Sequence, residues 1–327
     1  MNEAGQQPLG PFSLCIARPA WIGGLPEQAN HSDVVWKHLG PQGVPISALC
    51  SGFIIFEFDK SVEYAGGATP AYQLPESRAI PDNVMKAENE RRDLSYRRFV
   101  YMNAYLMALY SSLSTVQKRG MPVQEPVDPT NYYGARWTGE GWNIYMNAGR
   151  KVSPPKNRAE IIELDTLESA LDVLQKFDAK IGSPSRNILS LIYTACAQYS
   201  RHQFSSAHLI AWATIEALLN IMWVALQTQI DTAEGGHTII NKDRAKILNG
   251  RDFSASIICQ ILSISNKIDD RTLARLDKAR RTRNAFAHDL LPISGDDAAK
   301  AIGLATDMIS EIANVRVVSQ LSVSFWI

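Results

Sequence analysis

The sequence predicts an α+β protein in which a mixed α/β N-terminal region precedes an all-α helical bundle. The first 80 residues are rich in Gly and Pro and lack a helical period, whereas the chain from about residue 160 onward follows a helical pattern almost throughout. A length of 327 residues suits about two domains, and a hydrophobic content of 46% supports large cores. We place the division at the Pro-containing segment 149–158, between residues 1–158 and 159–327.

The N-terminal region is expected to contain β-structure and one long helix. The stretch 48–59 predicts a strand, because aromatic and β-branched residues lie there between Gly52 and Asp59. Residues 132–147 predict a β-hairpin, since two aromatic runs flank a Thr-Gly-Glu-Gly turn whose glycines tolerate positive φ. Residues 82–118 predict a helix that begins charged and becomes apolar.

The C-terminal region is expected to form six helices, near residues 165–180, 185–201, 205–229, 254–267, 270–289 and 295–315. Asp269 and Asp270 suit the start of the fifth helix, where free N–H groups favour acidic side chains. Ser294 and Asp297 resemble a capping box for the sixth helix. Pro292 prevents the fifth helix from continuing, so we expect an irregular end there.

The most apolar stretch, residues 207–226, predicts a buried core helix. It contains His208, Glu216 and Asn220, which a lipid-facing helix tolerates poorly. The N-terminus has no basic segment followed by an apolar one, so we expect no secretory signal. The four cysteines are scattered and form no Cys-x-x-Cys pair, which favours buried, reduced thiols in a cytoplasmic protein.

Composition excludes several classes of function. Lys plus Arg equals Asp plus Glu, at 33 each, so a nucleic-acid site requires local clustering of charge. The chain lacks the phosphate-binding, dinucleotide-binding, zinc-protease and serine-hydrolase motifs. His202 and His208 lie six residues apart, on different faces of any helix. We therefore expect no metal site and no cofactor.

Positive charge does cluster in residues 271–288, which contain six Lys or Arg and one acidic residue, Asp277. This segment has an ordinary explanation. A helix can present its charged face to solvent while Leu273, Leu276 and Phe286 face the core, and cations near a helix C-terminus are favoured by the dipole. Composition alone does not require a functional site.

The segment RNAFAH, residues 283–288, resembles the signature of HEPN domains, in which Arg precedes His by four to six residues late in a helical bundle. Residues 211–220, AWATIEALLN, are similar to a core helix with Trp and Glu that such domains often carry. The resemblance covers roughly residues 183–327. The Arg–His spacing alone is weakly specific, and the chain contains three such pairs, including Arg281 with His288 and Arg201 with His208.

The resemblance implies metal-independent cleavage of RNA by a homodimer that acts in bacterial defence or toxin-like growth arrest. His288 would transfer protons as RNA's 2′-OH attacks the adjacent phosphorus, which suits an imidazole because it titrates near neutral pH. Arg283 would hold the phosphate, and Asn284 would orient His288 or bind phosphate. Arg280 and Arg281 would provide further phosphate contacts. The N-terminal region would be a sensor or regulatory domain.

Helix geometry leaves the arginine assignment open. Asn284 and His288 share a face, but Arg283 and His288 are about 140° apart on a regular helix. They converge only if the last turn unwinds or the Arg side chain wraps around the helix. Arg281 lies nearly on the face of His288 and is the rival ligand for phosphate.

Three other interpretations also remain. Glu216 either pairs with an arginine for structural reasons or orients the Arg/His site. The HEPN-like module either cleaves RNA or binds a nucleotide or a protein partner without catalysis. The helical region can also be a structural interaction module in which the match at 283–288 arose by chance.

Overall fold

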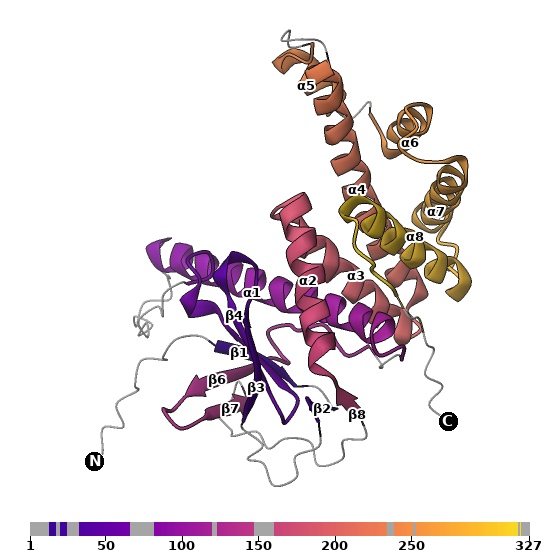
Figure 1. The fold of residues 1–327 in the computed structure, drawn as a ribbon. Helices are drawn as coiled ribbons and strands as arrows, with labels where there is room; N and C mark the ends of the chain where they lie inside the picture. The colour runs from indigo at the N-terminus through magenta and orange to yellow at the C-terminus, as the bar shows by residue number, and fades with distance from the viewer. Residues whose placement is uncertain are drawn as a thin grey trace. The chain divides into compact units, whose positions relative to one another are not determined.

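The chain folds as an α+β protein in the computed structural model, as the sequence predicts (Figure 1). The structure describes residues 13–17, 20–24, 33–65, 82–119, 123–146, 160–233, 239–250, 253–319 and 321. Two compact units divide them. Unit 1 comprises residues 1–117 and 126–175, and unit 2 comprises residues 118–125 and 176–327, within which the described residues are those given above. The segment 149–158, where we placed the domain division, lies outside the described residues.

Unit 1 is built on a sheet whose neighbouring strands are all antiparallel. Its order is β3-β4-β5-β1-β6-β7. The strands are β1 (Ser13–Ala17), β3 (Val34–Leu39), β4 (Pro45–Leu49), β5 (Phe53–Glu57), β6 (Tyr133–Trp137) and β7 (Trp142–Met146). Two short strands, β2 (Ala20–Ile22) and β8 (Glu160–Ile162), pair in parallel as a second sheet.

The predicted hairpin at 132–147 is confirmed as β6 and β7, and Gly139 in its turn has a φ of 96°. The predicted strand between Gly52 and Asp59 is β5. The first residues of that stretch, Ala48 and Leu49, instead end β4, because a turn at 50–52 reverses the chain. The sequence therefore predicted one strand where a tight β4–β5 pair exists.

The helix α1 (Asp82–Thr115) confirms the predicted long helix and packs on one face of this sheet. Phe56 of β5 meets Tyr101 and Tyr105 of α1 edge to face, with ring centroids 6.1 and 5.5 Å apart. All three aromatic side chains are fully buried. Because successive strand residues point to opposite faces, the neighbours of Phe56, including Glu57, face away from α1.

Unit 2 is helical. The division between the units falls within α2 (Leu164–Ile181), which is followed by α3 (Pro184–Ser200), α4 (Phe204–Ala233), α5 (Lys242–Leu248), α6 (Ala255–Ile264), α7 (Asp270–Asp289) and α8 (Gly295–Ala313). The six predicted helices are confirmed, and α5 was not predicted. Asp269 caps α7 by accepting from Thr272 N at 2.7 Å, and Ser294 caps α8 by accepting from Asp297 N at 3.1 Å.

The apolar helix α4 contacts α3, α6, α7 and α8, so it is the central helix of unit 2 (Figure 1). Its residues Phe204–Asp231 are long and apolar enough to cross a membrane, the one helix among the described residues to meet that test. The core helix of a soluble protein meets the same test, so this is weak evidence for a membrane span. The side chains Ala211, Ile215, Leu218 and Leu219 are buried against its neighbours, as the core-helix interpretation expects.

Three of the four cysteines, Cys50, Cys196 and Cys259, are buried free thiols, as expected from their scattered positions. Burial raises the pKa of Cys196 to about 12 and that of Cys259 to about 11. Both side chains therefore stay protonated near neutral pH and are poor nucleophiles.

Candidate functional site

Helix α7 carries the candidate site residues along one well-formed element. Leu276 and Ala279 are buried, and α4, α6 and α8 all contact the helix. The helix is regular through Asp289 and ends at Leu290, which adopts a left-handed conformation with a φ of 53°. The prediction of an irregular last turn before Pro292 is therefore wrong. The helical hydrogen bonds persist until Leu290, whose positive φ ends the helix.

The structure brings Arg283 and Asn284 together but leaves His288 apart. The Arg283 guanidinium donates through Nη1 to Asn284 Oδ1 at 3.0 Å, and both residues are half-buried. His288 is exposed one turn later in the last turn of α7. Among the described residues, no hydrogen bond joins His288 to Arg283 or Asn284. Because α7 stays regular, Arg283 and His288 lie about 140° apart around its axis.

Arg281 is the arginine that shares the exposed face of His288. Seven residues separate the two, which places them about 20° apart around the helix. Its side chain is 71% exposed and pairs with Asp277, its Nη2 lying 3.2 Å from Asp277 Oδ2. An exposed pair of this kind is worth little, so a phosphate can displace the carboxylate.

Arg280 is more strongly engaged than Arg281. Its Nη2 donates to Asp277 Oδ1 at 2.8 Å, and this hydrogen bond lowers the pKa of Asp277. Arg280 also lines a small recess with Trp212 of α4 and Cys259 of α6. It therefore faces the helical core more than solvent, and Arg281 is better placed to meet a phosphate.

Glu216 is half-buried on α4, one turn beyond Trp212. Among the described residues, no hydrogen bond or ion pair joins Glu216 to Arg283 or His288. His208 meets Ala279 of α7 and Trp212 lines a recess with Leu276, so α4 and α7 run antiparallel here. Glu216 thus lies toward the start of α7 and away from its C-terminal end.

Sequence reasoning missed a groove between α7 and α8. It has a volume of about 280 Å³, and its cationic lining residues are Arg271, Arg275, Lys278 and Lys300. The three from α7 follow the spacing i, i+4, i+7, which is the periodic signal that would have placed them on one helix face. Lys278 Nζ lies 3.0 Å from Asp297 Oδ1, and Arg275 Nη2 lies 2.7 Å from Asp307 Oδ2.

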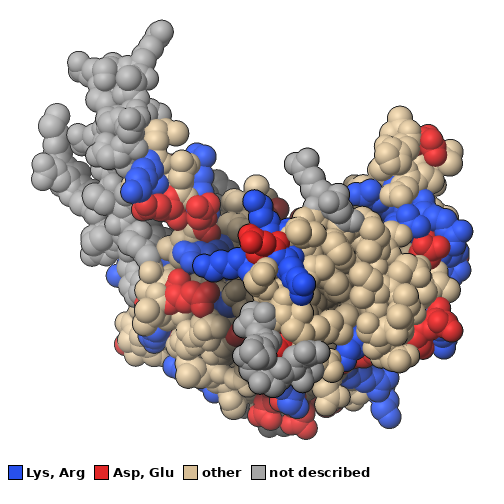
Figure 2. Space-filling model, turned by 90° about the horizontal axis from the view of Figure 1, so that it is seen from above, with Lys and Arg blue, Asp and Glu red and all other residues tan. Residues whose placement is uncertain are grey.

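Charge elsewhere is mixed. On the face drawn in Figure 2, basic and acidic side chains of the described residues are interspersed, with no extended area of one sign. This agrees with equal numbers of acidic and basic residues in the chain.

The floor of the α7–α8 groove is formed by His208 of α4, which is 1% exposed. Its Nε2 lies 3.1 Å from Ala279 O of α7, and its Nδ1 lies 3.3 Å from Asp297 O of α8. The imidazole thus contacts a backbone carbonyl of each of two neighbouring helices, and its one N–H can donate to either, which makes His208 a structural residue.

Replacing His208 with Ala is expected to lower the free energy of unfolding by about 3 kcal/mol, because the change opens a cavity among three helices and removes the hydrogen bond that the imidazole donates to a backbone carbonyl. Urea denaturation followed by circular dichroism measures this. His288→Ala, at an exposed position of the same unit, is the matched control and should change stability by no more than about 1 kcal/mol, the upper end of a helix-dipole contribution. Equal stability of the two variants would contradict the structural role of His208.

Comparison with known proteins adds no family to these observations. The chain matches no family model, no curated protein and no solved structure. Among the described residues, no group of three or more His, Cys, Asp or Glu side chains is arranged to hold a metal ion.

Proposed function

We propose that the protein is a metal-independent endoribonuclease of the HEPN kind, acting as a homodimer in the bacterial cytoplasm in defence or toxin-like growth arrest. The observation that carries the proposal is the exposed imidazole of His288, one helical turn from an Asn284 amide that holds the Arg283 guanidinium at 3.0 Å. A proton carrier, a phosphate ligand and an orienting amide are the groups that RNA cleavage needs.

In the proposed reaction, His288 accepts the proton of an RNA 2′-OH while that oxygen attacks the adjacent phosphorus. The bond from phosphorus to the 5′-oxygen breaks, and the leaving oxygen takes a proton from the imidazolium that His288 forms. Arginine stabilises the charge that develops on the phosphate oxygens. The products are a 2′,3′-cyclic phosphate and a 5′-hydroxyl end, and RNA supplies its own nucleophile.

A second copy of the chain supplies what one helix does not. Within one copy, Arg283 and His288 lie on different faces of α7, so in a dimer that joins two α7 ends, Arg283 of each copy would work with His288 of the other. Leu290 and Leu291, which follow α7, are 76% and 56% exposed. Two adjacent exposed leucines next to His288 favour an apolar contact between copies at this end of the helix.

Cleavage of a labelled single-stranded RNA in EDTA tests the reaction. We expect cleavage with 2′,3′-cyclic phosphate ends, and no cleavage of the same strand carrying 2′-O-methyl groups, because the methyl removes the nucleophile. Cleavage of the methylated strand, or activity only after a divalent metal is added, would contradict the mechanism.

One observation favours a second candidate, an RNA- or nucleotide-binding module without catalysis. Arg283 is half-buried and directed to Asn284, and it shares no face with His288. Such a module would bind RNA through exposed cations and leave it intact in every condition tested.

Both candidates predict that the α7–α8 groove contributes to RNA affinity. Replacing Arg271 and Arg275 with Gln is expected to reduce the slope of log K against log salt by about 1.4, since each cation contributes about 0.7 to the slope on single-stranded RNA. Fluorescence anisotropy at several salt concentrations measures the slope. The double variant Lys242→Gln, Lys246→Gln on α5 removes the same charge elsewhere and should leave the slope nearly unchanged. Equal slopes for both double variants would exclude the groove.

A further inference from the structure

The second feature of interest is a pocket in unit 1, on the sheet face opposite α1. It has a volume of about 560 Å³, and its lining includes Lys37 of β3, Ser47 of β4, Glu57 of β5, and Trp137 and Trp142 of the β6–β7 hairpin. Volumes of 300–1,000 Å³ are typical of small-molecule sites. No part of the proposed ribonuclease reaction uses these residues.

Strand register explains why these side chains meet. Lys37 pairs with Ser47, and Ser47 pairs with Ile55, so Glu57 lies on the same face two residues further along β5. Ser13 of β1 pairs with both Glu57 and Ala135, and Trp137 follows Ala135 by two residues. The register therefore places Lys37, Glu57 and Trp137 on the same face of the sheet.

The pocket contains a buried carboxylate with an unused acceptor. Glu57 is 3% exposed, and its Oε1 accepts no hydrogen bond from a described residue, although Lys37 Nζ lies 3.7 Å from it. Lys60 forms an ion pair with the other oxygen. Asp59, also in the lining, has a buried Oδ1 that accepts no hydrogen bond from the residues that the structure describes, and burial raises its pKa. Buried acceptors of this kind are costly unless a donor reaches them.

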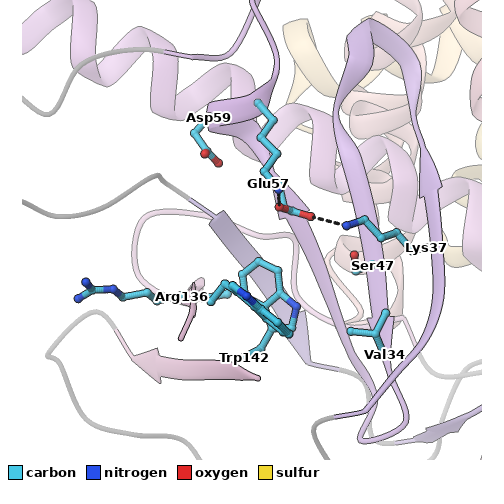
Figure 3. Close-up of a pocket in the computed structure, with 10 residues that line it drawn as sticks. Val34, Lys37, Ser47, Glu57, Asp59, Arg136 and Trp142 are labelled. Atoms are coloured by element: carbon cyan, nitrogen blue, oxygen red, sulfur yellow. Dashed lines mark ion pairs between the residues drawn. The ribbon is translucent and has the colours of Figure 1, made fainter. Parts of the chain in front are cut away.

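The opposite side of the pocket is aromatic. Trp142 is 9% exposed, Trp137 is 52% exposed, and their rings meet edge to face with centroids 5.6 Å apart. Figure 3 shows Glu57, Lys37 and Ser47 on neighbouring strands with Trp142 facing them, while the Arg136 side chain points away. A planar ligand between these sides would stack on an indole and turn one edge toward the carboxylate.

We propose that this pocket binds a guanine mononucleotide. The guanine ring stacks on Trp137 and Trp142, and its N1–H and N2–H groups donate to the Glu57 carboxylate. When the base occupies Glu57, the Lys37 and Lys60 ammonium groups leave the carboxylate and meet the phosphate at the mouth, which their side chains can do because they are 59% and 54% exposed. Base, phosphate and pocket are thereby matched in shape, hydrogen bonding and charge.

The carboxylate selects guanine among the bases. An ionised carboxylate only accepts hydrogen bonds, so it requires donors. Guanine presents two adjacent donors on its Watson–Crick edge, whereas adenine and cytosine each present an acceptor beside one amino group. Uracil presents one donor between two acceptors. Only guanine satisfies Glu57 without placing a ligand acceptor against it.

Calorimetric titration of the full chain with GMP, IMP and AMP tests the proposal. IMP is the matched ligand, since it differs from GMP by loss of the N2 amino group. We expect GMP to bind at least about tenfold more tightly than IMP and at least about 100-fold more tightly than AMP. Equal affinity for the three, or absence of GMP binding, would overturn the proposal.

Two substitutions connect binding to the pocket. Glu57→Gln should weaken GMP binding at least about 100-fold, because the amide NH₂ opposes the guanine donors. Trp137→Ala should weaken it about tenfold or more, and this half-exposed ring is removed at little cost to the core. Glu140→Gln, at an exposed position in the same hairpin, and His288→Ala should each bind GMP as the wild type does. Unchanged binding by Glu57→Gln, or lost binding by His288→Ala, would place the nucleotide elsewhere.

Discussion

His288→Ala is expected to reduce RNA cleavage by about 10²–10⁴-fold, the usual contribution of a general acid or base. The imidazole is exposed in the last turn of α7 and forms no hydrogen bond with another described residue, so proton transfer is the function that the substitution removes. Initial rates on a labelled RNA in EDTA, measured across pH 5 to 8, give the size of the effect. The substitution should also remove the limb of the pH profile that depends on the imidazole.

The substitution should leave the fold intact, which keeps the result interpretable. His288 lies where the helix dipole favours a cation, a contribution of about 0.3–1 kcal/mol that little affects a bundle with a large core. His38→Ala, which removes an imidazole whose side chain is 48% exposed in unit 1, is the matched control and should retain full activity. Equal cleavage by wild type and His288→Ala would contradict the assigned role.

The helices of unit 2 were predictable because their signals are local. Asp269 and Ser294 precede apolar periodic segments, and each accepts from a backbone N–H three residues on, at 2.7 and 3.1 Å. A helix pattern and its cap lie within one short window of sequence. The α+β class was predictable from the contrast between an N-terminal region without a helical period and a C-terminal region with one.

The sheet was less predictable because its pairings join distant residues. β1 lies between β5 and β6, so Cys15 pairs with both Ile55 and Tyr133 across long stretches of sequence. No local period indicates that order. The buried Glu57 escaped notice for the same reason, since only the register shows that Lys37 and Trp137 share its face.

The candidate site was predictable in part. Sequence reasoning selected the basic helix and gave the correct helical positions of Asn284 and His288, because the i, i+4 relation is fixed by helix geometry. It left open two ways for Arg283 to reach His288, an unwound last turn or an arginine side chain that wraps around the helix, and the regular helix through Asp289 removes the first. The structure also shows that Arg281 is exposed and Arg283 is half-buried, which residue spacing cannot predict.

Separating Arg283 from His288 leads to the second large effect, restoration of activity by mixing two inactive variants. If Arg283 of one copy works with His288 of another, then Arg283→Ala and His288→Ala are each inactive as homodimers. A heterodimer of the two contains one site with both residues intact and one with neither. Equal mixing followed by subunit exchange should restore about a quarter of wild-type activity, since half of the dimers then carry one of two sites.

The rival ligand predicts the opposite outcome and supplies the control. Arg281 lies about 20° from His288 on the same helix face, so the two would act within one copy. Mixing Arg281→Ala with His288→Ala should therefore restore nothing if Arg281 is the phosphate ligand, because each copy lacks one half of its own site. Activity of Arg283→Ala on its own, together with an inactive Arg281→Ala that mixing does not rescue, would reverse the assignment. Failure of the Arg283 mixture, with Arg283→Ala and His288→Ala each inactive alone, would contradict the pairing of Arg283 with His288 between copies.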